Sequence, residues 1–303
     1  MASPVIGTAR DRVRHRLGEA LFLRVAGPDG PEHRDRIHGR PGPRWFDPSS
    51  PIGRVHGDAS MFVGGIRAIL LQTLHPAAMT AVAEHSGYRG DMWGRLARTS
   101  RFIAVTTFGH EDDAQRAVDA VRRIHRRITG TMPDGTPYAA SDPHLLMWVH
   151  VAEVDSFLLA HQTYGKHPLD QAGRDEYVAQ TGEVARRLGV VDPPQTEAEL
   201  RAVLESFRPE LRVTDHARDA VGYLLWRPPL PVPLRPAYGV LMAAGIGLMP
   251  RWTRRPLRLP STPVTDRTVV RALGKASTST IRWAMAPGRE AVRNAVTERQ
   301  VAG

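Results

Sequence analysis

The feature that most constrains this fold is a run of helix-like segments that follow one another from residue 58 almost to the end of the chain. Within each segment apolar residues recur at three- and four-residue spacing, and glycine, proline or a short polar residue separates it from the next. No stretch alternates apolar and polar residues between hairpin turns, as half-buried strands do. We therefore expect an all-α fold, a single large helical domain without alternating strand–helix units.

Capping residues indicate where these helices begin. Asp58, Asp91 and Thr196 each precede an apolar segment and can accept a backbone N–H of the first turn. Asp142 is followed by Pro143, a combination that favours a helix start. The predicted helices are 58–75, 77–84, 91–109, 111–129, 145–164, 174–188, 196–207, 214–226 and a last one from about 265.

The N-terminal part has a different composition. Residues 1–25 form a charged lead-in that favours one helix, whereas residues 26–52 are rich in Gly, Pro, Asp and Arg and predict irregular structure on the surface of the domain. We expect the helical domain to span 26–290 and a tail to follow at 291–303.

The chain contains no cysteine. This excludes disulfides, iron–sulfur clusters, cysteine-based zinc sites and thiol nucleophiles, as well as covalent c-type haem and thiolate-ligated haem. Histidine, carboxylate, methionine or tyrosine must therefore hold any metal. The sequence also lacks the GxGxxG, P-loop, HExxH, GxSxG and EF-hand patterns.

A net charge of +10 and a pI near 10.8 favour attraction to nucleic acid or to an anionic membrane. The arginines are spread along the whole chain without a dense basic stripe and interleaved aromatics, so we expect no nucleic-acid partner. The apolar stretch Ala237–Pro250 is too short to span a bilayer. It predicts either a buried core helix or a shallow interfacial helix that gives peripheral membrane contact through 237–255. Met1–His15 shows no secretory signal, so we expect a cytoplasmic protein.

Two histidines lie on apolar helix faces. His125 shares a face with Val118, Val121 and Ile128, so its imidazole points inward. A neutral imidazole in an apolar pocket suits an axial haem ligand, but the same pattern fits a hydrogen-bonded core histidine. His150 lies on a similar stripe and is either a second ligand, a distal base or a core residue.

Other polar residues have two interpretations each. His75 precedes Pro76 and is either a pocket residue or an imidazole that complements a helix dipole. Arg95 and Thr99 lie one turn apart and either anchor a propionate or bound oxygen species or belong to the helix surface. Arg98 lies on a neighbouring face, where it could reach an adjacent pocket.

The acidic residues give weaker signals. Glu153 and Asp155 lie within a long apolar segment, and we expect both to be solvated or paired. Glu111, Asp112 and Asp113 suit the positive end of a helix.

Six short segments, taken together, resemble the MpaB-like oxygenase family, which contains the latex-clearing proteins (rubber oxygenases) and related actinobacterial proteins. The resemblance covers roughly residues 45–250, and it depends on the order and spacing of the segments. They are Gly64–Ala68, Leu71–Pro76, Arg95–Thr99, Phe108-Gly109, Val121–His125 and Trp148–His150.

The resemblance implies a mostly helical fold around a b-type haem. Rubber oxygenases cleave the carbon–carbon double bonds of polyisoprene with dioxygen. Arg95 and Thr99 match an Arg-x-x-x-Thr motif of that family, and His125 matches the proximal iron ligand. Arg98 stands where rubber oxygenases place a distal lysine. Because arginine keeps its charge, it is a poor iron ligand, although it could hydrogen-bond to bound oxygen.

The resemblance thus predicts a haem b-dependent oxygenase. Dioxygen would bind opposite His125, in a pocket lined by His75, the segment 95–106 and His150. Because the expected cytoplasmic location does not suit a polymer, a small lipophilic substrate such as a terpenoid or an unsaturated lipid fits better. Two alternatives stay open: a non-catalytic haem or lipophilic-ligand binder, such as a sensor or carrier, and a basic helical protein that docks on membranes or nucleic acid. The sequence does not indicate an oligomeric state.

Overall fold

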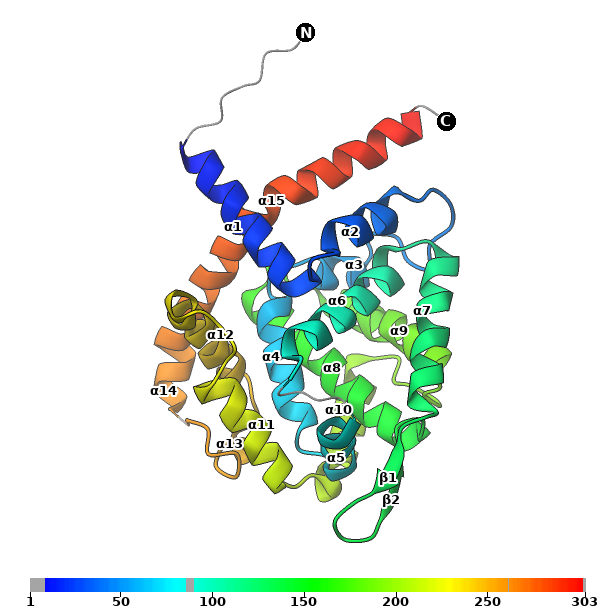
Figure 1. The fold of residues 1–303 in the computed structure, drawn as a ribbon, viewed down its shortest axis with the longest axis vertical. Coiled ribbons are helices and arrows are strands. Elements are labelled where there is room, and N and C mark those ends of the chain that lie inside the picture. The colour runs from blue at the N-terminus through cyan, green and yellow to red at the C-terminus, as the bar shows by residue number, and fades with distance from the viewer. Residues whose placement is uncertain (1–8, 86–89, 261, 302–303) are drawn as a thin grey trace.

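Helix α8 (Pro143–Tyr164) lies at the centre of the fold, and helix α4 (Met61–Gln72) packs along it (Figure 1). The computed structural model describes residues 9–85, 90–260 and 262–301. The two helices approach closely at Gly64, where an added Cβ atom would lie 2.9 Å from Phe157 and 3.3 Å from Ala160. Glycine is therefore required at this crossing.

The other helices surround this pair. They are α1 (Ala9–Ala26), α2 (Gly30–Gly39), α3 (Pro51–His56), α5 (Pro76–His85), α6 (Met92–Phe108), α7 (Glu111–His125), α9 (Gln171–Leu188), α10 (Glu197–Ser206), α11 (Asp215–Trp226), α12 (Arg235–Gly247), α13 (Arg251–Arg254), α14 (Pro263–Thr265) and α15 (Arg271–Val301). Short 3-10 turns lie at Arg208–Glu210 and Val232–Leu234, and a π-helical turn at Asp266–Val270 leads into α15. The expectation of an all-α fold is confirmed apart from one small hairpin.

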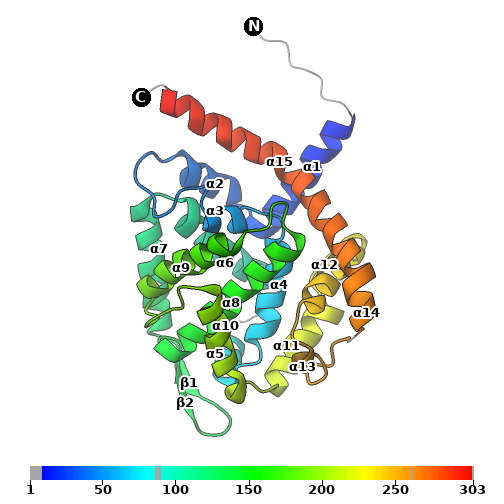
Figure 2. The same ribbon diagram turned by 180° about the vertical axis from the view of Figure 1, so that it is seen from behind.

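The helices form two groups on either side of α4 and α8 (Figures 1 and 2). Helices α6, α7 and α9 lie on one side, and α11, α12, α14 and α15 lie on the other. Helix α12 packs against both α4 and α15, while α1 packs against α15 and α6. The predicted lead-in is a helix from Ala9 onward, whereas residues 1–8 lie outside the described residues.

Large apolar side chains fill the space around α8. Trp148 on α8, Tyr177 on α9 and Leu200 on α10 are fully buried in one core with Leu70 and Leu71 of α4. Each such side chain contributes roughly 1.5–3 kcal/mol through the removal of apolar surface from water. The α8 face that bears Trp148 is therefore a structural face.

Three of the four predicted caps, Asp91, Asp142 and Thr196, are confirmed. The fourth is wrong, because α4 begins at Met61 with Ser60 as its N-cap, while Asp58 accepts the Ser60 N–H at 2.8 Å and pairs with Arg282 of α15. The side chain of Asp91 accepts the Gly94 N–H at 3.0 Å, and that of Asp142 accepts the His144 N–H at 2.9 Å. Thr196 accepts the Glu199 N–H at 3.1 Å at the start of α10.

The predicted end of the helix at 111–129 is wrong. Helix α7 ends at His125, and the chain then forms a hairpin of β1 (Thr129–Thr131) and β2 (Pro137–Ala139), with Thr131 opposite Pro137. Gly135 adopts a φ of +86° in the turn. Three-residue strands are too short to show alternation, but the Pro-Asp-Gly sequence at 133–135 is a turn signal.

The prediction of irregular structure over 26–52 is wrong for α2. Pro31 lies in the first turn of this helix, where a missing N–H has no cost, and Glu32 lies at its positive end. Ile37 is buried, and Arg36 binds Asp113 of α7 at 2.8 Å. Tertiary contacts therefore stabilise a helix that composition alone does not favour.

The apolar segment 237–250 is part of the core. Met242, Ala244, Ile246 and Met249 are buried in and after α12. In the part of the chain that the structure describes, no helix has the length and apolar character needed to cross a bilayer. Because the apolar face of α12 packs inside the protein, membrane contact in this region would need other side chains.

Candidate functional site

His125 lies where three helices and the hairpin meet. It is the last residue of α7, and its side chain lines a pocket of about 290 Å³. Ser141 after β2, Leu146 on α8 and the end of α9 at Leu188-Gly189 complete the lining together with Arg122 and Arg126. The hairpin after α7 brings Ser141 back beside the helix end, so the pocket depends on α7 ending at this residue.

The His125 imidazole is half-buried and has an unsatisfied nitrogen. Nδ1 is fully buried and makes no hydrogen bond to any described residue. Burial lowers the pKa of His125, so the ring is neutral at pH 7. A neutral imidazole with a free lone pair can bind a metal ion.

His150 lies on the side of α8 that faces this region, one turn after Leu146. Its Nε2 is buried, again without a hydrogen-bond partner in the described parts of the chain. Burial lowers the pKa of His150 to about 4. The expected inward orientation is confirmed, and the ring is a second neutral, unpaired imidazole.

Glu153 was expected to be solvated or paired, and this is wrong. Its carboxyl group makes no hydrogen bond or ion pair with a described residue, and burial raises its pKa to about 7. Glu153 follows Leu146 by seven residues, which is about two helical turns, so it lies on the same side of α8 as His150. That spacing was the signal in the sequence. Asp155 behaves as expected, because it pairs with Arg67 at 2.7 Å.

A chain of hydrogen bonds lies next to Glu153. His56 of α3 contacts Thr107 of α6 through Nδ1 at 2.8 Å and Tyr177 of α9 through Nε2 at 3.3 Å. Burial and the charge of Glu153 raise the pKa of Tyr177, while burial lowers the pKa of His56 to about 3. Neutral polar groups from α3, α6, α8 and α9 thus meet in the interior.

His75 belongs to a different cluster. Its Nδ1 accepts the Ala78 N–H at 3.5 Å, so it caps α5 and does not complement the end of the preceding helix. Its Nε2 lies 3.6 Å from Glu210, an ion-pair distance but too long for a hydrogen bond, and its ring packs against Trp148 and Phe207. These contacts explain His75 without a cofactor, and the structure does not bring it together with His125.

The α6 residues differ in exposure. Arg95 is half-buried, and burial followed by the charge of Arg98 lowers its pKa. The Arg95 guanidinium has no acidic partner among the described residues, so it suits an external anion. Thr99 is exposed, and Arg98 points to solvent, where it pairs with Asp91 at 3.0 Å. The roles predicted for Arg95, Arg98 and Thr99 stay predictions.

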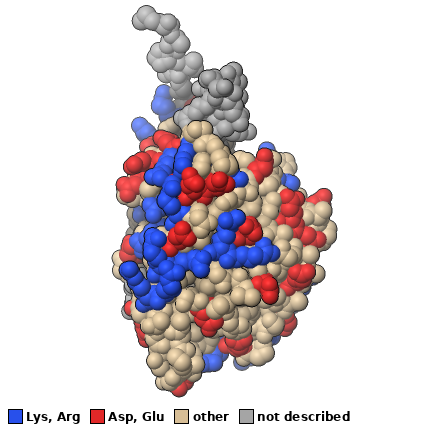
Figure 3. All heavy atoms as spheres, turned by 90° about the vertical axis from the view of Figure 1, so that its right-hand side faces the viewer, with Lys and Arg blue, Asp and Glu red and all other residues tan. Residues whose placement is uncertain are grey.

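Basic side chains surround the His125 pocket. Arg122 and Arg123 at the end of α7 and Arg126 and Arg127 after it are all exposed. None of the four forms an ion pair with an acidic residue that the structure describes. Figure 3 shows the side of the molecule that α7 covers, and basic side chains form a band across it. The rim of this pocket therefore attracts anions.

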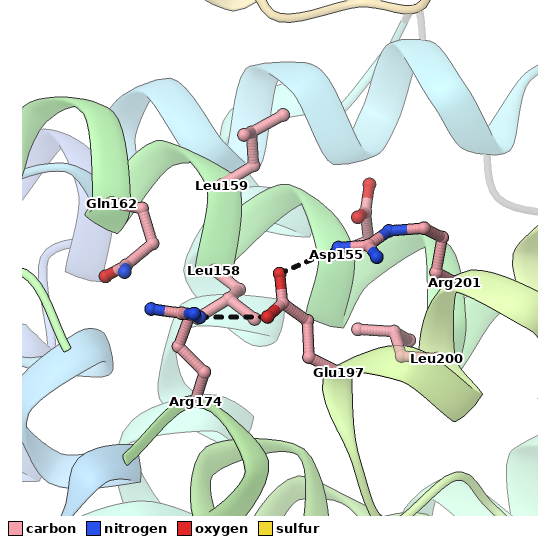
Figure 4. A pocket seen from close by; sticks show the side chains of 8 residues that line it. All are labelled: Asp155, Leu158, Leu159, Gln162, Arg174, Glu197, Leu200 and Arg201. Atoms are coloured by element: carbon pink, nitrogen blue, oxygen red, sulfur yellow. Dashed lines mark hydrogen bonds and ion pairs between the residues drawn. The ribbon is translucent and has the colours of Figure 1, made fainter. Parts of the chain in front are cut away.

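A second pocket, of about 370 Å³, lies between α8, α9 and α10 and contains none of the predicted site residues (Figure 4). Glu197 binds Arg174 at 2.9 Å and Arg201 at 3.0 Å across it. Gln162 exchanges two hydrogen bonds with the backbone of Leu169, each 2.8 Å long. Its charged and amide groups are already paired within the protein.

The donor set fits a haem. Among the described residues, no group of three or more histidine or carboxylate side chains is placed to hold a bare metal ion. A porphyrin brings its own four nitrogen ligands, so haem iron needs only one or two from the protein. The unpaired imidazole of His125 can provide one, whereas Arg95 is not among the residues that line the His125 pocket.

Comparison with protein families decides the identity of the fold. Residues 53–279 match the family described as "ER-bound oxygenase mpaB/B'/Rubber oxygenase, catalytic domain". The chain belongs to this family. The match includes α4, the Arg95–Thr99 segment, His125 and His150 and confirms the resemblance found in the sequence. No curated protein and no solved structure matches the chain.

Membership supports a general oxygenase role, because the family is defined by an oxygenase catalytic domain. The matched region extends from α3 into α15, so it includes both groups of helices. The candidate site lies within it.

Proposed function

We propose that this protein is a haem b-dependent oxygenase that acts on a small lipophilic substrate, such as a terpenoid or an unsaturated lipid, with dioxygen as co-substrate. The observation that carries the proposal is His125, a neutral imidazole with an unpaired buried nitrogen at the position that resembles the proximal ligand of rubber oxygenases. Membership of the oxygenase family supports the enzymatic part.

His125 would hold the cofactor through its imidazole. Burial keeps the ring unprotonated at neutral pH, so a nitrogen lone pair is available for iron. When bound, the haem supplies redox-active iron for the reaction of dioxygen with the substrate.

Arg95 would hold an anionic group of the cofactor. Its half-buried guanidinium has no competing carboxylate among the residues described, and a charge-assisted hydrogen bond to a propionate would satisfy it. Thr99 lies one turn further along α6 and can donate a hydroxyl hydrogen bond from the same side.

His150 and Glu153 would control protons in the interior. His150 is neutral at pH 7 and accepts a proton only at a pH near its pKa of about 4. Glu153, with a pKa of about 7, exists in both protonation states at neutral pH and can release or take up a proton. Phe157, which is buried one turn after Glu153, excludes water from this part of α8.

The test is reconstitution with haem b followed by dioxygen uptake. We expect a Soret band after reconstitution, and dioxygen consumption that depends on an added unsaturated terpenoid or lipid and yields an oxygenated product. A Soret band without substrate-dependent uptake across such a panel would contradict the catalytic part and support a carrier or sensor. Failure to form a Soret band would contradict the proposal that the protein binds haem b.

A further inference from the structure

The segment between α11 and α13 has an unusual charge pattern. From residue 220 to residue 265 the chain has no aspartate or glutamate but has six arginines. They are Arg227, Arg235, Arg251, Arg254, Arg255 and Arg258. Arg254 is buried and pairs with Asp266, whereas Arg227 and Arg235 are exposed at the two ends of the loop that connects α11 to α12. This stretch of the chain is therefore positively charged.

The same loop exposes large apolar side chains. Trp226 is 79% exposed, Val232 is 69% exposed and Leu234 is 46% exposed, all within nine residues. The apolar face of the following helix is buried in the core, so these side chains are separate from it. Scattered single apolar residues are normal on a protein surface, but a tryptophan grouped with two aliphatic residues marks a contact surface.

The loop is held in place before it meets a partner. Pro228, Pro229, Pro231 and Pro233 restrict its backbone, because each proline fixes its own φ angle. Trp93 Nε1 donates to the Pro229 carbonyl at 2.9 Å, and Arg235 Nε donates to the Leu230 carbonyl at 3.3 Å. A restricted loop loses little conformational entropy on binding.

We propose that the loop from Trp226 to Arg235 is a docking surface for an anionic lipid bilayer. Trp226, Val232 and Leu234 enter the interfacial region, where a tryptophan ring with its polar N–H is favoured. Arg227 and Arg235 bind lipid phosphates on either side. The surface is independent of the haem proposal, and in Figures 1 and 2 the loop lies between α11 and α12.

Two other partner classes fit the loop less well. A domain that binds proline-rich segments contacts prolines in an extended backbone, and this mode of binding gives no role to the exposed Trp226 side chain. Nucleic acid would bind the arginines, but it gains nothing from the two exposed aliphatic side chains. The combination of tryptophan, aliphatic residues and flanking arginines favours a lipid surface.

The experiment is co-sedimentation of the full chain with phosphatidylcholine vesicles, with and without phosphatidylglycerol. We expect binding to the anionic vesicles that Trp226→Ser weakens at least about tenfold. We expect Arg227→Gln and Arg235→Gln to weaken it about fivefold each. Val191→Ser removes an apolar side chain after α9 whose exposure (61%) lies between those of Val232 and Leu234, and serves as the control with unchanged binding.

Depth of insertion gives an independent readout. Brominated lipids should quench the wild-type fluorescence more strongly than that of Trp226→Phe, because the difference isolates this one indole. Equal binding to neutral and anionic vesicles, or binding unaffected by Trp226→Ser, would overturn the proposal. Salt-sensitive binding to a DNA duplex that Trp226→Ser leaves unchanged, without vesicle binding, would assign the surface to nucleic acid instead.

Discussion

The two pockets, one near the start of α9 and the other at its end, differ in how their charged and polar groups are satisfied. In the larger pocket, Glu197 forms ion pairs with Arg174 and Arg201. Asp155, which also lines this pocket, forms an ion pair with Arg67 of α4. In the smaller pocket, the His125 imidazole has a buried nitrogen without a partner, and Arg126 has no acidic partner among the described residues.

The larger cavity volume therefore does not identify the functional site in this protein. A buried polar group without a hydrogen bond costs free energy, and proteins keep such groups where a ligand satisfies them. The charged groups of the larger pocket have partners within the protein, whereas His125 Nδ1 has none among the described residues. The following substitutions separate a structural pocket from a ligand pocket.

Arg67→Met should have the largest effect, and on stability alone. Arg67 is 3% exposed and binds Asp155 at 2.7 Å and Ser156 at 2.7 Å. Its loss would leave the Asp155 carboxylate unpaired, which typically lowers the free energy of unfolding by about 3–5 kcal/mol. Urea unfolding measures this change.

Haem affinity of the folded Arg67→Met protein should equal that of the wild type. Selective loss of haem binding with normal stability would mean that the paired pocket belongs to the functional site and would remove the contrast between the pockets.

Glu153→Gln should change the pH dependence of stability. Burial raises the folded-state pKa of Glu153 from its ordinary value of 4.5 to about 7, so the folded state binds the proton more tightly and loses stability relative to the unfolded state as pH rises. The wild type should lose up to about 3 kcal/mol of stability between pH 4.5 and pH 7.5 through this group.

The glutamine variant should lack that loss, so its advantage over the wild type should be near zero at about pH 4, grow as the pH rises above about 5 and reach its full size above about pH 7. Denaturation across this pH range measures it. Glu176→Gln on α9 is the control, because Glu176 accepts a hydrogen bond from Gln180 near the surface. Parallel pH profiles for wild type and Glu153→Gln would argue against an enclosed carboxyl group.

Glu197→Gln should have the smallest effect. Glu197 lies in the first turn of α10, and both of its arginine partners keep contact with water. Partly exposed ion pairs contribute little, so we expect a loss of about 1 kcal/mol in urea unfolding and an unchanged haem spectrum. A loss above about 3 kcal/mol would place this ion pair among the main stabilising contacts.

Much of the fold could be predicted from local signals. The caps at Asp91, Asp142 and Thr196 depend on residues two or three positions away, so the sequence carries them directly. Helix α2 and the hairpin after α7 could not be predicted in this way. The first depends on contacts with α7, and the second on strands too short for a periodic pattern.

The candidate site could be predicted only in part from the sequence. Periodicity placed His125 and His150 on inward faces, but the partners of a side chain come from distant segments. The partner of His75 is Glu210, which lies 135 residues away in the sequence. The Glu153 carboxyl group has no partner among the described residues, and its burial depends on the helices that pack around α8. Such pairings depend on how helices pack, and no single segment encodes them.

The central claim is that His125 is the protein ligand of a haem. The most direct measurement is the visible absorption spectrum of wild type and His125→Ala after the same reconstitution with haem b. We expect a Soret band for the wild type and its loss or marked weakening in His125→Ala, with His75→Gln unchanged because His75 belongs to the Glu210 cluster. An identical Soret band in wild type and His125→Ala would show that His125 is not the haem ligand.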